Sequence, residues 1–360
     1  MKWTFTPAIL LLAMGGCGRL PRPILLEQER PALDRCIQLT HGFERAGEAY
    51  FSPDMRWIIF QAVPSGQQDY QMYVAPLVQR GGWIVDVGQP VQISPPGSRN
   101  TCGYFSPDGQ SLIFASTREK ALATRPSRPA TRGRYAWEFT PEMEIWALHG
   151  WQAFVRQQGR DASRGGFRWQ RLTNNQAYDA ECAYSPDGKW IVYCSTESGD
   201  ADIYVMRADG TGKVRITNAR GYDGGPFFSP DGKRLVYRSD RKGDDKLQIF
   251  VADLAFDAAG NITGAARERQ ITSDGFNNWA PYWHPDGRHI IYATNCHGHA
   301  NYELYMIRDD GTDLRRITYA DGADVLPVFS ADGKYLMWTS KRTRNQTVQV
   351  LLARFQMGEP

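Results

Sequence analysis

Carboxylate and amide side chains recur at a fixed register in this sequence, ahead of a turn that is repeated six times. Such side chains accept hydrogen bonds and could bind a cation, a sugar or a basic peptide. Six residues before the turn, five of the six copies carry Asp or Asn, and two residues later two copies carry Glu. The candidate ligand-binding residues are Glu48, Asn100, Asp179, Glu181, Asp223, Asn278 and Asp324.

The same regular spacing has a structural interpretation. Asp and Asn side chains readily hydrogen-bond to nearby backbone groups, so one of them at the start of each repeated strand could cap that strand. A binding surface and a set of caps both remain open, because the spacing alone does not separate them.

Two histidines, His297 and His299, flank a glycine in one loop and could ligate a metal together with nearby carboxylates. No third ligand is fixed by spacing, and a hydrogen-bonding loop pair is the alternative. The six cysteines do not show zinc-ligand spacing. The sequence also lacks a Gly-x-Ser-x-Gly elbow and a phosphate-binding glycine loop. We therefore predict no catalytic residue, no metal site and no cofactor.

A repeated turn organises the elements that must position these residues. It is clearest at 104–109, with the sequence Tyr-Phe-Ser-Pro-Asp-Gly. Proline fixes φ for a tight turn, Asp bonds to the local backbone, and Gly accepts the positive φ that closes a hairpin. The other copies start at Tyr50, Ala183, Phe227, Tyr282 and Val328.

Strands flank each turn. An aromatic residue follows the turn Ser or His by eight positions, within a short apolar run that suits a strand. These aromatic residues are Phe60, Phe114, Tyr193, Tyr237, Tyr292 and Trp338. A Thr or Ser precedes the turn Ser or His by 12 positions in every repeat and ends another short strand. These residues are Thr40, Ser94, Thr173, Thr217, Thr272 and Thr318.

A further strand, such as 202–205, completes four strands per repeat. Six such repeats predict an all-β fold, a six-bladed β-propeller of four-stranded antiparallel blades. The last repeat ends after its third strand, so we expect Cys36–Thr40 to supply the fourth and close the ring. The propeller is expected over 36–355, with blade repeats around 41–94, 95–173, 174–217, 218–272, 273–318, and 319–355 plus 36–40.

The N-terminus reads as a secretion signal over residues 1–16, with Lys2 followed by an apolar run too short to span a membrane. Met14–Cys17 resembles a bacterial lipobox, which implies lipid attachment at Cys17; ordinary cleavage near Ala13–Gly16 is the alternative. Residues 17–35 are expected to be a tether. We therefore expect a membrane-anchored lipoprotein of the cell envelope that faces the periplasm.

The charge balance narrows the choice of partners. The chain has 42 basic and 39 acidic residues, a formal net charge of +3. This near-balance predicts no nucleic-acid partner. We expect a monomer whose length is ample for one large core.

The repeat Ser-Pro-Asp-Gly-Lys followed by Ile-Val-Tyr at 185–193, and Ala-Asp-Gly-Thr at 208–211, resemble the propeller repeats of the TolB family. Proteins of that family are periplasmic, and the resemblance extends over 36–355. Together with the lipobox-like segment, it leads us to expect an envelope lipoprotein form without the TolB N-terminal domain, which recognises a protein or glycan at its channel face. Similar repeats occur in prolyl oligopeptidases and oligogalacturonate lyases. A metal-dependent polysaccharide lyase or hydrolase is therefore the alternative function.

Overall fold

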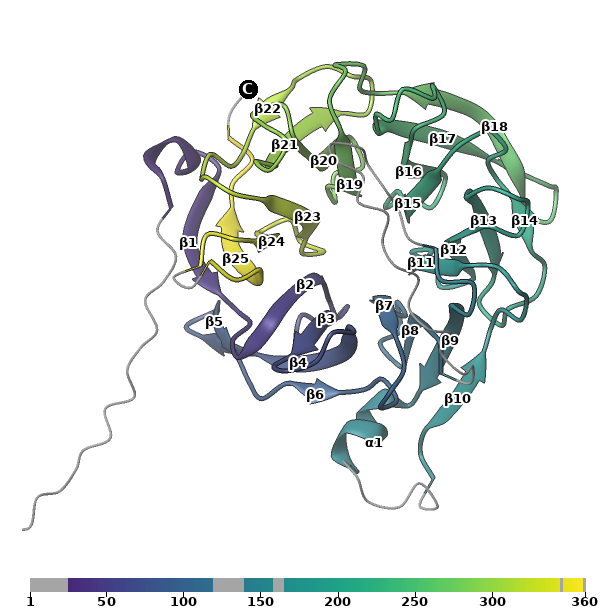
Figure 1. The fold of residues 1–360 in the computed structure, drawn as a ribbon, viewed down its shortest axis with the longest axis horizontal. Coiled ribbons are helices and arrows are strands. Elements are labelled where there is room, and N and C mark those ends of the chain that lie inside the picture. The colour runs from purple at the N-terminus through teal and green to yellow at the C-terminus, as the bar shows by residue number, and fades with distance from the viewer. Residues whose placement is uncertain (1–24, 119–138, 158–164, 344–345, 359–360) are drawn as a thin grey trace, which may run out of the picture.

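The computed structural model describes residues 25–118, 139–157, 165–343 and 346–358, and in this part six antiparallel sheets surround a central channel (Figure 1). The six-bladed β-propeller expected from the repeats is confirmed. The first strand of each blade lies nearest the channel, and the later strands lie progressively further out (Figure 1).

The first three blades follow one another in chain order. The first sheet contains β2 (Phe43–Phe51), β3 (Trp57–Pro64), β4 (Gln71–Arg80), β5 (Trp83–Val87) and β6 (Val91–Gln92). The second contains β7 (Asn100–Phe105), β8 (Ser111–Ser116), β9 (Glu144–His149) and β10 (Arg168–Arg171), with helix α1 (Trp151–Arg156) between its last two strands. The third contains β11 (Asp179–Tyr184), β12 (Trp190–Ser195), β13 (Asp202–Arg207) and β14 (Val214–Arg215).

The last three blades complete the ring. The fourth sheet contains β15 (Asp223–Phe228), β16 (Arg234–Ser239), β17 (Gln248–Phe256) and β18 (Ile262–Gln270). The fifth contains β19 (Asn278–Trp283), β20 (His289–Thr294), β21 (Glu303–Arg308) and β22 (Arg315–Arg316). The sixth contains β23 (Asp324–Phe329), β24 (Tyr335–Ser340), β25 (Gln349–Phe355) and the N-terminal strand β1 (Leu33–Gln38).

The N-terminal strand closes the ring as the sequence predicts. Strand β1 pairs antiparallel with β25, with Ile37 opposite Leu352. It begins three residues earlier than the expected Cys36–Thr40. Thr40 itself accepts a hydrogen bond from the amide of Val350 at 2.9 Å. The first and last segments of the chain therefore share one blade.

The expected tether is corrected from residue 25 onward. Leu25 and Leu33 are buried against the sixth blade, and a short 3-10 helix, η1 (Glu27–Glu29), lies between them. Both carboxylate oxygens of Glu29 accept hydrogen bonds from Arg342, at 2.7 and 2.8 Å. This segment packs because its apolar side chains and one buried ion pair complete the last blade. Residues 1–24, which include Cys17 and the expected signal, lie outside the described part.

The repeated Thr and Ser residues tie adjacent strands together. In every blade one such hydroxyl accepts a hydrogen bond from a third-strand amide, at 2.8–3.0 Å. The aromatic residues that follow the turns are buried between blades, each at most 2 % exposed. Burial of such a side chain stabilises the fold by about 1.5–3 kcal/mol. The repeated Thr or Ser and the repeated aromatic residue in the sequence therefore identify the core of each blade.

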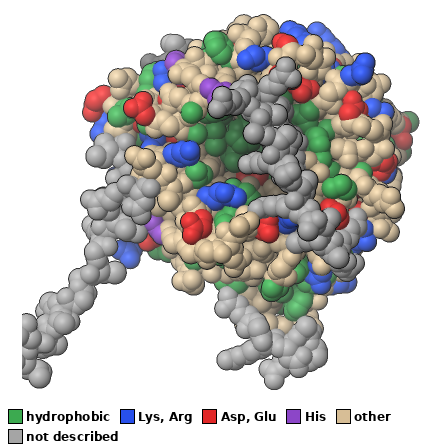
Figure 2. Space-filling model, in the orientation of Figure 1, with side chains coloured by type: hydrophobic (Ala, Val, Ile, Leu, Met, Phe, Trp, Pro, Cys, Tyr) green, Lys and Arg blue, Asp and Glu red, His purple; other side chains and the backbone are tan. Residues whose placement is uncertain are grey.

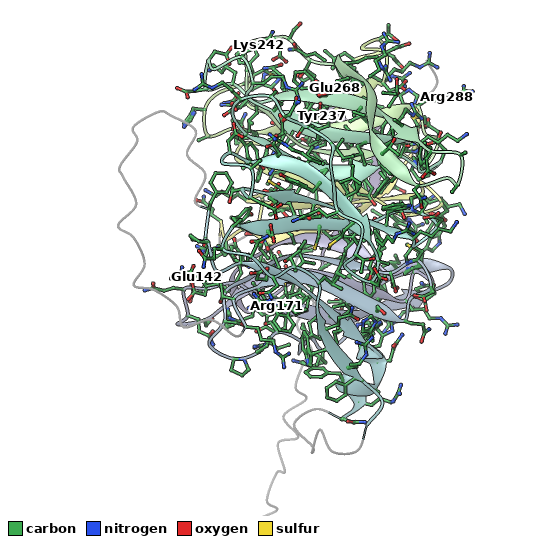
Figure 3. All side chains as sticks on the ribbon, turned by 90° about the vertical axis from the view of Figure 1, so that its right-hand side faces the viewer. Glu142, Arg171, Tyr237, Lys242, Glu268 and Arg288 are labelled. Atoms are coloured by element: carbon green, nitrogen blue, oxygen red, sulfur yellow. The ribbon has the colours of Figure 1, made fainter. Side chains whose placement is uncertain are left out.

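The propeller has two distinct faces. We call the side that carries the six turns the turn face, and the opposite side, where the inner strands begin, the cavity face. Lys242 and Glu142 lie on the cavity side and Arg288 lies on the turn side (Figure 3). Among the helices in the described ranges, none has the length and apolar character needed to cross a membrane.

Candidate functional site

A β-bulge interrupts each inner strand at the same place. Between Ala180 and Ala183, for example, two residues of β11 lie opposite one residue of β12. The same shift occurs in the other five blades. The first bulged residue has a positive φ between 47° and 58° in all six. These residues are Glu48, Cys102, Glu181, Gly225, Ala280 and Leu326.

Five of these six residues are not glycine, so the bulges carry conformational strain. The left-handed conformation costs an L-residue about 1–2 kcal/mol. Such strain persists only where the surrounding structure determines the backbone, and it clusters at functional sites. All six bulged residues line one cavity in the channel. The bulges are therefore the device that positions these residues at the channel.

This channel cavity has a volume of about 200 Å³. Tyr70, Tyr178 and Trp279 line it near the start of the inner strands, on the cavity face. In a view of that face, hydrophobic side chains surround the hollow at the centre (Figure 2). A mostly apolar wall with a few polar groups is typical of a ligand site.

An aromatic cluster forms the floor of the channel cavity. Tyr50, Tyr104, Phe227 and Tyr282 contact one another with ring centroids 4.9–6.4 Å apart. The Tyr104 and Tyr282 hydroxyls lie 3.2 Å apart. A second cavity of about 360 Å³ lies on the turn face and shares three of these rings as lining. The cluster thus separates the two ends of the channel.

Glu181 belongs to a buried ion-pair network in the channel cavity. Its carboxylate accepts hydrogen bonds from the Tyr222 hydroxyl at 2.9 Å and from the Gly225 amide at 2.5 Å. The Arg238 guanidinium lies 3.1 Å away, and both charged side chains are 5 % exposed. A buried pair of this kind needs such additional hydrogen bonds to offset the loss of hydration. Glu181 is therefore neutralised and fixed.

The glycines of the fourth blade make room for this network. A Cβ on Gly225 would lie 1.9 Å from Nη1 of Arg238, and a Cβ on Gly224 would lie 2.2 Å from the Tyr222 hydroxyl. At the fourth bulge, Arg238 occupies the space that a bulged side chain fills in the other blades. The absence of two side chains is thus a requirement of the Glu181 site.

Glu48 has a different environment. Its nearest polar contacts are the Tyr50 hydroxyl, 3.5 Å from Oε1, and the Cys102 thiol. Within the described ranges it makes no ion pair with Lys, Arg or His. Burial is the largest of the effects that together raise the pKa of Glu48 to about 7; the charge of Glu181 acts in the same direction, and Cys102, Arg238 and Tyr50 oppose it. Among the described residues, Glu48 is therefore a carboxyl group that forms no ion pair.

The other five candidates from the sequence lie within the blades, each at most 2 % exposed. The Asn100 amide donates to the carbonyl of Tyr70 at 3.2 Å, and Asp179 accepts from the Asn175 amide at 2.7 Å. Burial raises the pKa of Asp179 to about 6. None of the five lines the channel cavity. Asn100 thus bonds to a backbone carbonyl, as the capping interpretation expects, whereas Asp179 bonds to a side chain.

Asp223, Asn278 and Asp324, the other three of these buried candidates, bond to side chains. Asp223 accepts from Arg241 at 3.2 Å, although burial still raises its pKa to about 6. The Asn278 amide donates to Asp274 at 2.9 Å. Asp324 accepts from the Trp338 indole at 3.1 Å and also bonds to Arg342. Of the seven candidates, the structure brings only Glu48 and Glu181 together.

The two histidines of the candidate metal loop do not converge on carboxylates. His297 Nε2 lies 2.7 Å from the Tyr305 hydroxyl, and His299 is exposed. In the part of the chain that the structure describes, no group of three or more His, Cys, Asp or Glu side chains could hold a metal ion. The geometry at this loop is that of a hydrogen-bonding pair.

Sequence reasoning did not identify Arg238 or Trp279. Arg238 directly follows the aromatic residue of its repeat, where the other repeats carry Gln61, Ala115, Cys194, Ala293 and Thr339. A lone charged residue within a buried run is a signal of a buried ion pair. Trp279 carried no comparable signal, because its place in the cavity depends on the adjacent bulge.

Comparisons with known proteins agree with the fold. Residues 174–275 match the family model of the TolB beta propeller domain. A protein named uncharacterized peptidase YuxL, from Bacillus subtilis, is 26% identical over 190 residues. That alignment spans 47% of this chain and 26% of the relative, about a quarter of its length.

Solved structures show the same architecture. A protein assigned as TolB from Agrobacterium tumefaciens superposes with a TM-score of 0.54 at 18% identity, covering 86% of this chain and 90% of that one. An oligogalacturonate lyase from Vibrio parahaemolyticus superposes with a TM-score of 0.51 at 13% identity, covering 88% and 80%. At these identities the likeness establishes the fold alone.

Proposed function

Because the chain carries a TolB-like six-bladed propeller, we propose that it is a non-catalytic binding protein of the cell envelope that holds a protein or glycan partner at its cavity face. The observation that carries this proposal is the channel cavity, which six bulges line and which contains Glu48, a carboxyl group that forms no ion pair with any described residue. A buried charge without an ion-pair partner is costly, and a cationic ligand would offset that cost. The binding residues we propose are Glu48 and Glu181, with Tyr70 and Trp279 at the mouth.

Attachment to a membrane through lipid on Cys17 is part of this proposal. The lipobox-like sequence at Met14–Cys17 supports it. Metabolic labelling with a radioactive fatty acid should mark the wild-type chain and not Cys17→Ser. Equal labelling of both chains would remove the anchor from the proposal and leave the cavity unaffected.

Site-specific photo-crosslinking in cells tests the binding face. We expect p-benzoyl-phenylalanine in place of Tyr70, on the cavity face, to give a discrete cross-linked product. The same group in place of Arg288, on the turn face, serves as the matched control and should give none. The product should persist with a chelator present and should weaken when Glu48→Gln is added. A product from the Arg288 position alone would place the partner on the other face and contradict the proposal.

The alternative function, a metal-dependent polysaccharide lyase or hydrolase, gains no specific support from the site geometry. His297 bonds to Tyr305 and the described residues hold no metal-binding group. The likeness to an oligogalacturonate lyase concerns the fold. Loss of the cross-linked product with the chelator would favour this alternative.

A further inference from the structure

The charges of the channel cavity do not balance. Of the residues that the structure describes, three with normally charged side chains line it: Glu48, Glu181 and Arg238. Glu181 and Arg238 form an ion pair at 3.1 Å, so they neutralise each other. Glu48 remains as an excess carboxyl group, which makes the cavity complementary to a cation.

The surroundings of Glu48 favour a compact cation with several donors. The Tyr50 hydroxyl lies beside it, and the Gln61 and Thr101 side chains line the same cavity. Gln61 Oε1 accepts hydrogen bonds from the Thr101 hydroxyl at 2.7 Å and from the Cys102 amide at 3.4 Å, so the hydroxyl oxygens of Tyr50 and Thr101 are the single acceptors that remain beside Glu48. A primary ammonium has three donors on one atom, whereas a guanidinium needs a planar fork of acceptors. The arrangement of single oxygens around Glu48 suits the ammonium.

A second group in the cavity lacks its partner. Trp279 lines the cavity, and its indole Nε1 is shielded from solvent and has no hydrogen-bond acceptor among the described residues, so the ring must turn for this N–H to reach a ligand in the cavity. An indole N–H can only donate. A complete ligand therefore presents both a cationic donor for Glu48 and an acceptor for Trp279. A peptide offers both, as an ammonium group and a backbone carbonyl.

We propose that the channel cavity binds a primary ammonium group of a polypeptide, with Glu48 as its counter-ion and Trp279 as donor to a peptide carbonyl. This inference rests on the proposed function, because it names the chemistry of the partner at the same site. The ammonium belongs either to a lysine side chain or to a free N-terminus, and the experiment below separates these sources.

The probes are three small amides, titrated into the full-length chain at pH 8. Nα-acetyl-lysine N-methylamide carries a side-chain ammonium, glycine N-methylamide carries a free α-ammonium, and Nα-acetyl-norleucine N-methylamide is the neutral analogue. The readout is the indole ¹H–¹⁵N signal of Trp279, assigned by its loss in Trp279→Phe. We expect at least one ammonium probe to shift this signal and to bind at least tenfold more tightly than the norleucine probe.

Two variants locate the effect. Glu48→Gln removes the charge and should reduce the affinity for the ammonium probe at least tenfold. Glu44→Gln, an exposed glutamate on the same strand, is the matched control and should leave the affinity unchanged. Thermal melts of both variants show whether they fold. Should Glu48→Gln fail to fold, Trp279→Phe provides the second test, with a lower affinity for the ammonium probe measured by calorimetry.

The outcomes separate the two proposals. Equal binding of the lysine and norleucine probes, or full affinity in folded Glu48→Gln, would overturn the ammonium site. If the Tyr70 cross-linked product nevertheless persists, the binding function stands and only its chemistry is wrong. If the ammonium probe binds through Glu48 but no product forms in cells, the proposed function fails and the ammonium site remains.

Discussion

Gly225 shows how strongly one residue can depend on a neighbour far away in the sequence. Its φ is +58°, and the guanidinium of Arg238 lies where its side chain would be. The same bulge position holds Glu48 and Glu181 in other blades, where a side chain enters the channel. Glycine is therefore required here both for its conformation and for its lack of a Cβ.

Gly225→Ala should lower the free energy of unfolding by about 3 kcal/mol, because it displaces Arg238 from the buried carboxylate of Glu181. The measurement is urea denaturation. Gly260→Ala is the control, since Gly260 also has a positive φ, +79°, but nothing lies within 4 Å of its Cβ position. Gly260→Ala should lower the free energy of unfolding by only about 1 kcal/mol, through backbone strain. Equal losses in the two variants would show that backbone strain alone explains the effect.

Glu48→Gln should stabilise the chain at pH 8 and have little effect at pH 5. Burial raises the pKa of Glu48 to about 7, so the folded state binds a proton that the unfolded state has already released above its ordinary pKa of 4.5. Stability from this group is therefore complete below pH 4.5 and is lost as the pH rises through 7. We expect Glu48→Gln to increase the free energy of unfolding by about 2 kcal/mol at pH 8. This is less than the whole change in pKa would give, because the cavity admits water.

The groups that face Glu48 are Glu181, Arg238, Cys102 and Tyr50, and none of them changes in this variant. Denaturation midpoints at pH 5 and pH 8, compared between Glu48→Gln and the exposed Glu44→Gln, measure the effect. A gain that is equal at both pH values would mean that improved packing, and not titration, is responsible.

At the scale of strands, the hydroxyl groups of the repeated Thr and Ser residues determine how each blade is assembled. Thr217 accepts a hydrogen bond from the Ile203 amide at 2.9 Å and is 1 % exposed. The fixed distance of 12 residues between Thr217 and the turn Ser229 therefore reflects the length of one connection and one inner strand. Loss of the hydroxyl would leave a buried amide without an acceptor.

Thr217→Val should destabilise the chain by about 2 kcal/mol, because valine preserves the shape and removes only the acceptor. Thr211→Val is the matched control: Thr211 bonds to Asp209 in an exposed hairpin. That change should lie within about 0.5 kcal/mol of wild type. Chemical denaturation of both variants gives the comparison, and a loss below 1 kcal/mol at Thr217 would contradict the anchoring role.

The strands and turns were predictable from the sequence because the residues that determine them contact close neighbours in the sequence. In the second blade, the Ser106 hydroxyl bonds to Asp108 and accepts from the Ser111 amide, all within one turn. The bulges were not predictable, because their residues range from glutamate to leucine and carry no shared signal. The partnership of Glu181 with Arg238 joins residues 57 positions apart on different blades. The regular spacing therefore identified five residues that are buried within the blades as readily as the two that line the channel cavity.

At the scale of the whole molecule, one buried ion cluster joins the N-terminal segment to the last blade. Arg342 bonds to both Glu29 and Asp324, and all three side chains are at most 6 % exposed. Burial of Glu29 raises its pKa, but its bonds to Arg342 outweigh this effect and its pKa is lowered overall. The ring closure thus includes charge as well as the pairing of β1 with β25.

Arg342→Ala should reduce the free energy of unfolding by about 3–5 kcal/mol, because it leaves two buried carboxylates without their cation. Hydrogen exchange of β1 should accelerate more than that of β11. Arg315→Ala is the control, since its bond to Asp313 lies in a partly exposed pair and should contribute at most about 1 kcal/mol. Uniform acceleration in all blades would argue against a local role at the closure.

The closing strand also constrains the order in which the chain can reach its final form. Thr40 and Val350 bond across 310 positions of sequence, so β1 has no partner until about 310 further residues have been synthesised. Contacts of such long range slow folding, and strands that wait unpaired can join another chain. The first five blades, which are built from consecutive strands, can assemble one by one during this interval. The nascent protein therefore passes through an open, five-bladed stage in which both ends of the ring need protection from neighbours.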